Sequence, residues 1–262
     1  MNTVKKQRNN MKILACDYDG TLNRGGGVTQ RDIEAIQRWQ AAGNLFGTDS
    51  GRSWDSLFNV WHGVPIAPDF VIASTGTQVY DRGGRLLLDT VADGSRIHEL
   101  CSLIFERGGY YIWIGSDYGR WMLSPDGKFP ENTKEVTATV ETLPQIPTIR
   151  NVTTYFDNEE IAVSFCREMN ERFKGYYMGC ANVDMPEITP YDANKGKGLA
   201  NYIKYMDLQP EEIIVAGDSG NDLPMLTYEG FIGYVPYSGS KYVLEKVGRG
   251  VADIAEIIEK HI

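Results

Sequence analysis

The sequence predicts an α/β protein: a Rossmann-like, doubly wound parallel sheet into which a second, α+β domain is inserted. Apolar strand patterns alternate with helical patterns from residue 11 to about residue 73, and this alternation returns after Lys195. Between these two parts, hairpin and helix patterns follow one another without the parallel rhythm. We therefore expect residues 1–88 and 189–262 to form the core and residues 89–188 to form an inserted cap domain.

The first elements are recognised by their ends. Met11–Cys16 is a short apolar run that stops at acidic and glycine residues, as a buried parallel strand does where it meets a loop. Thr29 is placed as an N-cap, Asp32 completes a capping-box pattern, and Gly43 ends the helix. The same reasoning predicts a strand at 44–48, a helix at 53–61 and a strand at 70–73.

The pattern changes after Thr77. Residues 78–80 and 86–88 flank Arg82–Gly84 like the two arms of a hairpin. In the insert we expect helices near 95–107 and 158–173 and strands near 109–114, 148–154 and 176–189. The core then resumes with a helix from 195 to about 206, a strand at 212–216, a short helix after 221, a strand at 231–234 and a C-terminal helix.

The composition narrows the class of protein. The chain has 262 residues and a net charge of −9, so we expect no general attraction to nucleic acid or to an anionic membrane. No apolar run is long enough to span a bilayer, and we expect no secretory signal in the polar first ten residues. The four cysteines are scattered without a CxxC pair, which favours reduced thiols in the cytoplasm and argues against zinc. With 3 histidines in the chain, carboxylates are the better candidates for chemistry.

Two carboxylates follow the first strand. Asp17 and Asp19 are two residues apart in an extended segment, so their side chains can share one pocket. Two negative charges at such a short distance repel each other, unless a bound cation or a proton reduces the repulsion. The pair therefore indicates a metal site, a split acid and base, or both, although Asp and Gly are also ordinary turn residues.

A second acidic loop favours the metal. Asp218, Asn221 and Asp222 follow another apolar strand and precede a helix. If both strands lie in one parallel sheet, the two loops emerge at the same edge, and Asp17 with Asp218 can hold one oxygen-loving cation.

Two further segments supply groups that suit a phosphate. Ser50, Gly51 and Arg52 follow a strand and offer a hydroxyl and backbone N–H groups near a helix start. Lys195 opens the helix that leads to the second acidic loop, and its ammonium can neutralise a phosphoryl oxygen.

In this order, DYDGTL at Asp17, SGR at Ser50, the Lys-Gly pair at Lys195 and GDSGND at Gly217 resemble the motif set of the haloacid dehalogenase (HAD) superfamily. The resemblance spans the whole chain. The insert lies between the second and third motifs, as in the subgroup with a type-two (C2B) cap that includes Cof-type and sucrose-phosphatase-like sugar phosphatases. Two positions depart from the family pattern: Asp49 replaces a small residue, and Thr75-Gly76 stands where Asn-Gly is common.

The resemblance implies a phosphatase mechanism. Asp17, ionised as an ordinary Asp is at neutral pH, attacks phosphorus and forms an aspartyl phosphate, while Asp19 serves as general acid and then base. Mg2+ is bound by Asp17, Asp218 and the backbone carbonyl of Asp19. The residues expected to bind the phosphate are Ser50, Gly51, Arg52, Lys195 and Asn221. Asn221 and Asp222 are also expected to orient Lys195 and the metal's waters.

The cap is expected to choose the leaving group. By resemblance, Asn182, Asp184 and Glu187 lie where the cap meets the core and contact that group. Tyr110, Tyr111, Trp113 and Trp121 fit the core of the cap better than a platform for a sugar ring, although both interpretations stay open. The expected substrate is a small phosphorylated metabolite, in the first place a sugar phosphate. The alternatives are phosphoglycolate or a cofactor phosphate, and a non-catalytic protein that binds a phosphorylated metabolite.

Two lookalikes fail on context. Gly217–Gly220 matches the nucleophile segment of chymotrypsin-like proteases, but the upstream His segment and the succession of strands are missing from the sequence. Asp17–Gly20 echoes a calcium-binding EF-hand, but the glycine comes at the fourth position, Val28 stands at the twelfth, and a strand precedes the loop.

Overall fold

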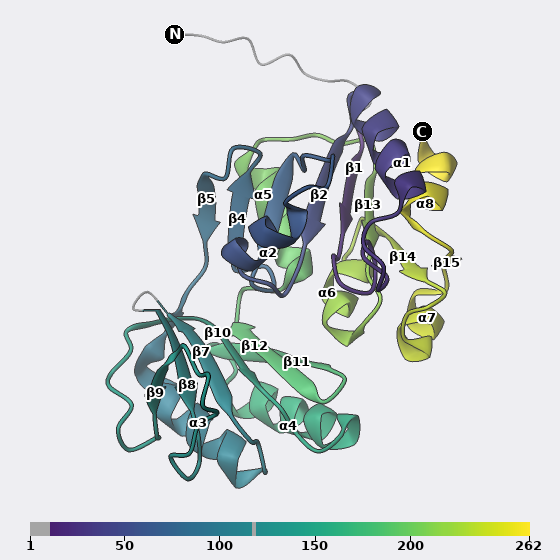
Figure 1. Cartoon of the computed structure of the whole chain (residues 1–262). Coiled ribbons are helices and arrows are strands. Elements are labelled where there is room, and N and C mark those ends of the chain that lie inside the picture. The colour runs from purple at the N-terminus through teal and green to yellow at the C-terminus, as the bar shows by residue number, and fades with distance from the viewer. Residues whose placement is uncertain (1–10, 117–118) are drawn as a thin grey trace, which may run out of the picture.

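The computed structural model describes residues 11–116 and 119–262, which build two sheets joined by two connections (Figure 1). The larger sheet has eight strands in the order β15-β14-β13-β1-β2-β3-β4-β5, and the smaller has seven strands, with β11-β12-β10-β7-β8-β9 in a row and β6 paired to β10. The α/β class with a parallel core is confirmed.

The parallel part of the larger sheet is assembled from both ends of the chain. The central strand β1 pairs in parallel with β2 on one side and with β13 on the other. On the β2 side, β3 pairs antiparallel with β4, and β4 pairs antiparallel with the edge strand β5. The strands are β1 (Ile13–Cys16), β2 (Leu45–Asp49), β3 (Phe70–Ala73), β4 (Gln78–Asp81), β5 (Leu86–Asp89), β13 (Ile213–Ala216), β14 (Ile232–Pro236) and β15 (Gly250–Val251).

Helices cover both faces of this sheet, because alternate residues of each buried strand point to opposite sides. Side chains of α1 (Gln30–Ala41), α2 (Trp54–Trp61) and α8 (Ile254–His261) pack with one face. Side chains of α5 (Lys195–Tyr205), α6 (Leu223–Leu226) and α7 (Lys241–Val247) pack with the other. The predicted N-cap of α1 is confirmed, since Thr29 accepts a hydrogen bond from the backbone N–H of Asp32.

The smaller sheet is covered by helices on one face. Its apolar side packs against α3 (Ile97–Glu106) and α4 (Glu159–Arg172) in a separate hydrophobic core. The other face is directed toward the larger sheet (Figure 1) and carries both polar and aromatic side chains, among them Thr153, Glu187 and Trp113. Its strands are β6 (Ala92–Asp93), β7 (Ile112–Ser116), β8 (Gly119–Leu123), β9 (Val136–Ala138), β10 (Thr148–Thr154), β11 (Tyr177–Asn182) and β12 (Met185–Pro190).

We call the segment from Ala92 to Pro190 the insert. The chain enters it after β5 and leaves it through residues 191–194, which lead directly into α5. Compared with the expected elements, the single stretch at 176–189 is a hairpin of β11 and β12, and β6, β8, β9, α7 and β15 were not predicted. In the hairpin turn Val183 adopts a positive φ of 55° without glycine, so the usual turn signal is missing there.

The four cysteines are unpaired, and three of them are buried. Among the described residues, the structure contains no helix that is both long and apolar enough to cross a membrane.

Candidate active site

The predicted acidic loops meet at the carboxyl edge of the larger sheet. Cys16 and Ala216, the last residues of β1 and β13, are paired in register, so the loops that follow them leave the sheet side by side. Asp17 follows the first strand directly and is 5% exposed, and Asp218 lies two residues beyond the second.

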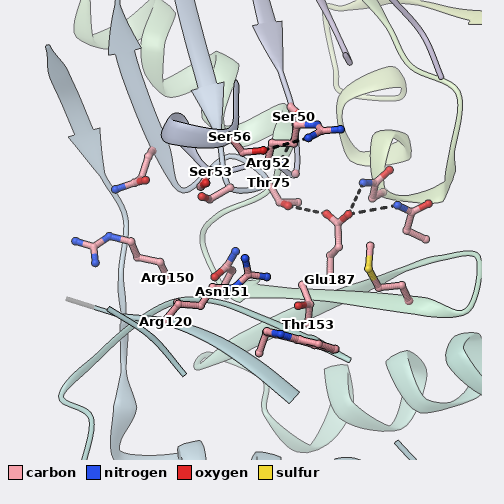
Figure 2. Close-up of a pocket in the computed structure, with 18 of the residues that line it drawn as sticks. Ser50, Arg52, Ser53, Ser56, Thr75, Arg120, Arg150, Asn151, Thr153 and Glu187 are labelled. Atoms are coloured by element: carbon pink, nitrogen blue, oxygen red, sulfur yellow. Dashed lines mark hydrogen bonds between the residues drawn. The ribbon is translucent and has the colours of Figure 1, made fainter. Parts of the chain in front are cut away.

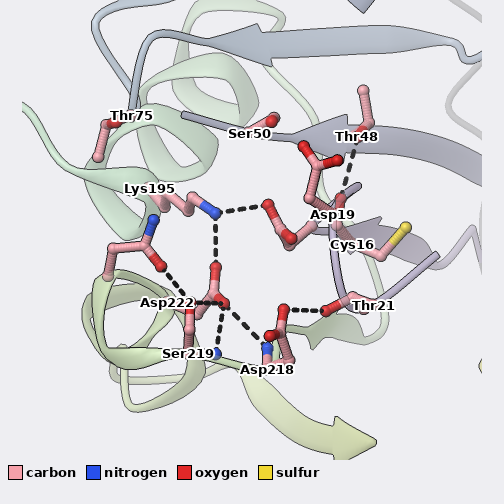
Figure 3. A network of polar contacts seen from close by, with 12 residues as sticks. Cys16, Asp19, Thr21, Thr48, Ser50, Thr75, Lys195, Asp218, Ser219 and Asp222 are labelled. Atoms are coloured by element: carbon pink, nitrogen blue, oxygen red, sulfur yellow. Dashed lines mark hydrogen bonds and ion pairs between the residues drawn. The ribbon is translucent and has the colours of Figure 1, made fainter. Parts of the chain in front are cut away.

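Lys195 links the two loops from the start of α5 (Figure 3). Its Nζ donates hydrogen bonds to Oδ1 of Asp17 at 2.7 Å and to Oδ1 of Asp222 at 2.6 Å. The lysine is 1% exposed. Burial alone lowers its pKa, but the neighbouring charges of Asp17 and Asp222 outweigh burial and hold the pKa above its ordinary value, so the ammonium stays charged.

Asp222 organises the second loop as well as holding the lysine. Its Oδ2 accepts hydrogen bonds from the backbone N–H groups of Asp218 and Ser219, at 2.9 and 3.0 Å. Asp218 in turn accepts a hydrogen bond from the Thr21 hydroxyl at 2.9 Å. Gly20 packs against Asp218 so closely that an added Cβ would lie 2.5 Å from Oδ2, and its φ of 82° also requires glycine.

Oxygen atoms of Asp17, Asp218 and Asp222 lie within 4.8 Å of one another. Three carboxylates against one ammonium leave two negative charges uncompensated, which matches the charge of one divalent cation. Burial, with Asp222 next in importance, raises the pKa of Asp218 to about 6. Burial also raises the pKa of Asp17 well above its usual value. The residues fit a hard cation, which would keep both groups ionised.

The segment Ser50–Arg52, which was predicted to bind phosphate and is called the phosphate seat below, lines the same cavity as Asp17. Ser50 is buried, and its Oγ accepts a hydrogen bond from the Arg52 backbone N–H at 3.2 Å. The loop after β3 closes over it, because the Thr75 N–H donates to the Ser50 carbonyl at 3.0 Å. Ser74 and Thr75 have positive φ values of 51° and 58°, a costly conformation for a β-branched residue. Thr75 thus takes a left-handed conformation that Asn adopts more readily.

The Asp19 carboxylate is not part of the cluster formed by Asp17, Asp218 and Asp222. It forms a two-pronged ion pair with Arg52, in which Nη2 of Arg52 lies 2.8 Å from Oδ1. Arg52 also donates to the Ser56 hydroxyl at 3.1 Å. In this arrangement the Arg52 guanidinium is engaged by Asp19 instead of facing a phosphate. The two groups were predicted to act separately, and their pairing is a finding of the structure.

Glu187 reaches from the insert to the phosphate seat. It is 7% exposed and accepts hydrogen bonds from the Thr75 hydroxyl at 2.6 Å and from Nδ2 of Asn221 at 2.9 Å (Figure 2). Asn182 donates to it at 3.3 Å, and its carboxylate lies against Gly51. Asn221 therefore contacts Glu187, whereas the lysine is held by Asp17 and Asp222, contrary to the expected orienting role of Asn221.

A cavity of about 960 Å³ separates the insert from the seat. Asp184 does not line it, because the residue lies in the turn of the β11–β12 hairpin, whereas Asn182 and Glu187 do. Of the aromatic residues considered, Trp113 lines the cavity, together with Tyr155, which was not predicted. The cavity is also lined by Asp17, Asp19, Ser50, Gly51, Arg52 and Asn221.

The model of the haloacid dehalogenase-like hydrolases matches residues 14–245. The chain belongs to this family. As a haloacid dehalogenase-like hydrolase, it resembles two phosphatases of Bacillus subtilis strain 168. It is 25% identical to 5-amino-6-(5-phospho-D-ribitylamino)uracil phosphatase YwtE over 84% of this chain and 86% of that protein. It is 24% identical to phosphatase YwpJ over 84% and 87%.

Solved structures of other haloacid dehalogenase-like hydrolases share the fold. The HAD subclass IIB sugar phosphatase BT4131 aligns with a TM-score of 0.75 and 18% identity, over 95% of this chain and 97% of that one. A haloacid dehalogenase-like hydrolase from B. subtilis aligns with a TM-score of 0.76 and 18% identity, over 96% and 100%.

Proposed function

We propose that the chain is a magnesium-dependent phosphatase that hydrolyses a small phosphomonoester, in the first place a sugar phosphate, through an aspartyl phosphate. The observation that carries the proposal is the contact of Asp17 with Lys195 beside Asp218, at the floor of a cavity that the insert closes. This set places a nucleophile that lines the cavity in contact with a fixed cation and beside a candidate metal site.

In the first step an oxygen of Asp17 attacks phosphorus, and the bond from phosphorus to the leaving oxygen breaks. Asp19 donates a proton to that oxygen. To do so, the Asp19 carboxyl group must leave its ion pair with Arg52 and contact the substrate instead. Lys195 stays charged and faces the negative charge that develops on the phosphoryl group. Ser50 and the N–H groups of its loop bind the remaining oxygens.

In the second step water attacks phosphorus, and the bond from phosphorus to Asp17 breaks. Asp19, now a carboxylate, accepts the proton from that water. Asp17 and Asp218, with the backbone carbonyl of Asp19, would hold Mg2+. When bound, the cation supplies charge neutralisation between the nucleophile and the substrate.

A sugar phosphate suits the cavity better than a two-carbon phosphate does. The space of about 960 Å³ is at the upper end for ligand pockets, and a glycolate would leave most of it unfilled. Glu187, Asn182 and Asn151 line it with groups that pair with hydroxyls. The relative that acts on a phosphoribitylaminouracil supports a second candidate, a polyol phosphate attached to a ring. A purely binding protein is disfavoured, because the carboxylates and the lysine stand in contact.

The test is phosphate release from a panel of phosphorylated metabolites and p-nitrophenyl phosphate, with Mg2+ and with excess chelator. We expect turnover with Mg2+ and none with chelator. Asp17→Asn keeps the shape but loses the nucleophile, so it should lower kcat by about 10³-fold or more while the circular dichroism spectrum stays unchanged. Near-normal phosphate release by this variant would refute the covalent mechanism, and full activity in excess chelator would refute the proposed metal site.

A further inference from the structure

The open face of the insert sheet carries an ordered array of side chains. Glu187, Thr153 and Trp113 are cross-strand neighbours on β12, β10 and β7, and they form one row that begins at the phosphate seat. The adjacent row consists of Asn151, Gly115 and Arg120 on β10, β7 and β8. All six residues line the cavity.

The first row changes in character with distance from the seat. Glu187 and Thr153 offer oxygen atoms, whereas Trp113 offers a flat ring, against which Tyr155 packs edge-on with ring centres 5.8 Å apart. Hydroxyls near the phosphate are thus followed by an apolar surface. A leaving group that follows this row is polar at its phosphorylated end and contacts the ring further along.

The second row ends in a positive charge. Between Arg120 and Asn151 stands Gly115, where an added Cβ would lie 2.2 Å from Oδ1 of Asn151, so the amide of Asn151 fills the space over the glycine and lies between Gly115 and the cavity, with Arg120 next in the row. Figure 2 shows Arg120, Asn151 and Arg150 gathered at one part of the cavity, away from Glu187. Arg150 sits at a register shift of β10 and is held by Asp89 through two hydrogen bonds of 3.0 and 2.6 Å.

The guanidinium of Arg120 is exposed and only loosely held. Its side chain is 62% exposed, and its ion pair with Glu135 is long, with Nε 3.9 Å from Oε1, too far for a hydrogen bond. Three strand spacings of about 4.8 Å each, roughly 14 Å in total, separate the backbone of β8 from that of β12. A leaving group that reaches from the seat to Arg120 must therefore be extended, and longer than a two-carbon unit.

We propose that the leaving group carries a second oxyanion, a carboxylate or a phosphoryl group, at the end remote from the scissile phosphate, and that Arg120 binds it. This proposal rests on the proposed function and names its substrate class: a phosphorylated sugar acid or a bisphosphate. A guanidinium matches both oxyanions by paired N–H donors. Asp55 lines the core side of the same cavity, and its charge opposes such a ligand.

The experiment compares substrates that differ at this end alone. Sorbitol 6-phosphate ends in a neutral hydroxymethyl group, 6-phosphogluconate in a carboxylate, and sorbitol 1,6-bisphosphate in a phosphoryl group. With Mg2+, we expect kcat/KM for at least one anionic member to exceed that of the neutral member by about tenfold or more. The two anionic arms distinguish carboxylate from phosphoryl recognition.

Substitutions test whether Arg120 causes the preference for anionic over neutral substrates. Arg120→Gln should reduce the ratio of anionic to neutral kcat/KM to about one, mainly through KM, and Asp55→Asn should increase it. Arg167→Gln is the matched control, because this substitution removes the same charge at a different place. Arg167 is an exposed residue of α4, the helix that covers the opposite face of the same sheet. A wild-type ratio near one, or the same loss on all three substrates in Arg120→Gln, would overturn the proposal.

Binding separates this proposal from the proposed function. In Asp17→Asn, calorimetry with Mg2+ should give a dissociation constant for 6-phosphogluconate or the bisphosphate about tenfold below that for sorbitol 6-phosphate, and adding Arg120→Gln should remove the difference. Equal affinities would refute the anionic end whether or not the enzyme turns over. Absence of magnesium-dependent phosphate release from every substrate, p-nitrophenyl phosphate included, would instead refute the phosphatase assignment.

Discussion

Asp49 is fully buried one residue before Ser50, and neither of its carboxyl oxygens has a hydrogen-bond partner among the described residues. It lies on the strand position next to that of Asp17, since Thr48 and Cys16, which precede the two, are paired in register. Desolvation raises its pKa well above the ordinary value. An unpaired polar group in such a place lowers the stability of the fold.

Asp49→Ala should therefore raise the free energy of unfolding at pH 7 by on the order of 1 kcal/mol. Because the folded state keeps its proton where the unfolded chain has lost it, wild-type stability falls as pH rises above the ordinary Asp pKa, and the gain should be smaller at pH 4. Urea unfolding at both pH values measures this. Thr48→Ala is the control, since it removes a hydroxyl that does have a partner, the Cys16 carbonyl, and should lower stability. A comparable loss in Asp49→Ala would contradict the prediction.

The sequence located residues whose neighbours are set by the sheet, and it could not locate those set by packing between the two sheets. Asp17 and Asp218 were expected together because parallel strands end at one edge. Glu187 was expected at the meeting of cap and core, but its bonds to Thr75 and Asn221 depend on how the insert sits, which no local pattern encodes. The pairing of Asp19 with Arg52 likewise depends on side-chain directions in two loops.

At the scale of elements, strands formed by continuous apolar runs and helices with clear caps were predicted, and irregular strands were not. In Gly119–Leu123 a glycine and the charged Arg120 are followed by three apolar residues. The sequence therefore shows no alternation of polar and apolar residues with a period of two. Val136–Ala138 has 3 residues, too few for any pattern. By contrast β3 lies within the predicted bounds, because four buried residues in a row form a clear signal.

The β12 strand brings Glu187 to the seat, and Glu187→Gln should change substrate ranking. Loss of the carboxylate weakens bonds to substrate hydroxyls, each worth on the order of 1–3 kcal/mol under a closed insert. The kcat/KM values for sugar phosphates should shift against one another by more than they shift for p-nitrophenyl phosphate. Asp184→Asn is the control, since Asp184 does not line the cavity. Equal losses on all substrates would assign Glu187 to fold maintenance.

The loop after β3 supports the start of α5. Gly76 has a φ of 90°, and an added Cβ would lie 2.1 Å from the carbonyl oxygen of Asn194, the N-cap residue before Lys195. Gly76→Ala should lower the free energy of unfolding by about 1–3 kcal/mol and reduce kcat, because the backbone that carries the lysine must shift. Gly63→Ala, at a similar φ of 86° with nothing within 4 Å, isolates the conformational cost. Equal effects of the two changes on kcat would exclude this contact as the cause.

For the whole molecule, the cation and the proton compete for the same carboxylates. The pKa of Asp218, about 6 in the folded protein, lies above its ordinary value, so metal-free stability should fall as pH rises from about 4 to about 6. Mg2+ should raise Tm at pH 7.5 and raise it less at pH 5, since binding requires ionised ligands. Thermal unfolding with Mg2+ or with chelator at both pH values measures the difference. An equal rise at both pH values, or one that survives in Asp218→Asn, would count against the metal site.

The exit from the insert is short. Only residues 191–194 separate the last strand of the insert from Lys195. At the strand end, the Thr189 hydroxyl donates a hydrogen bond of 2.6 Å to the Ala193 carbonyl. At the helix end, the Asn194 side chain caps α5. The strand that carries Glu187 and the helix start that carries Lys195 are thus joined by four residues that side-chain hydrogen bonds hold at both ends. Any rotation of the insert relative to the core would have to be absorbed within these four residues or be passed on to the backbone of Lys195.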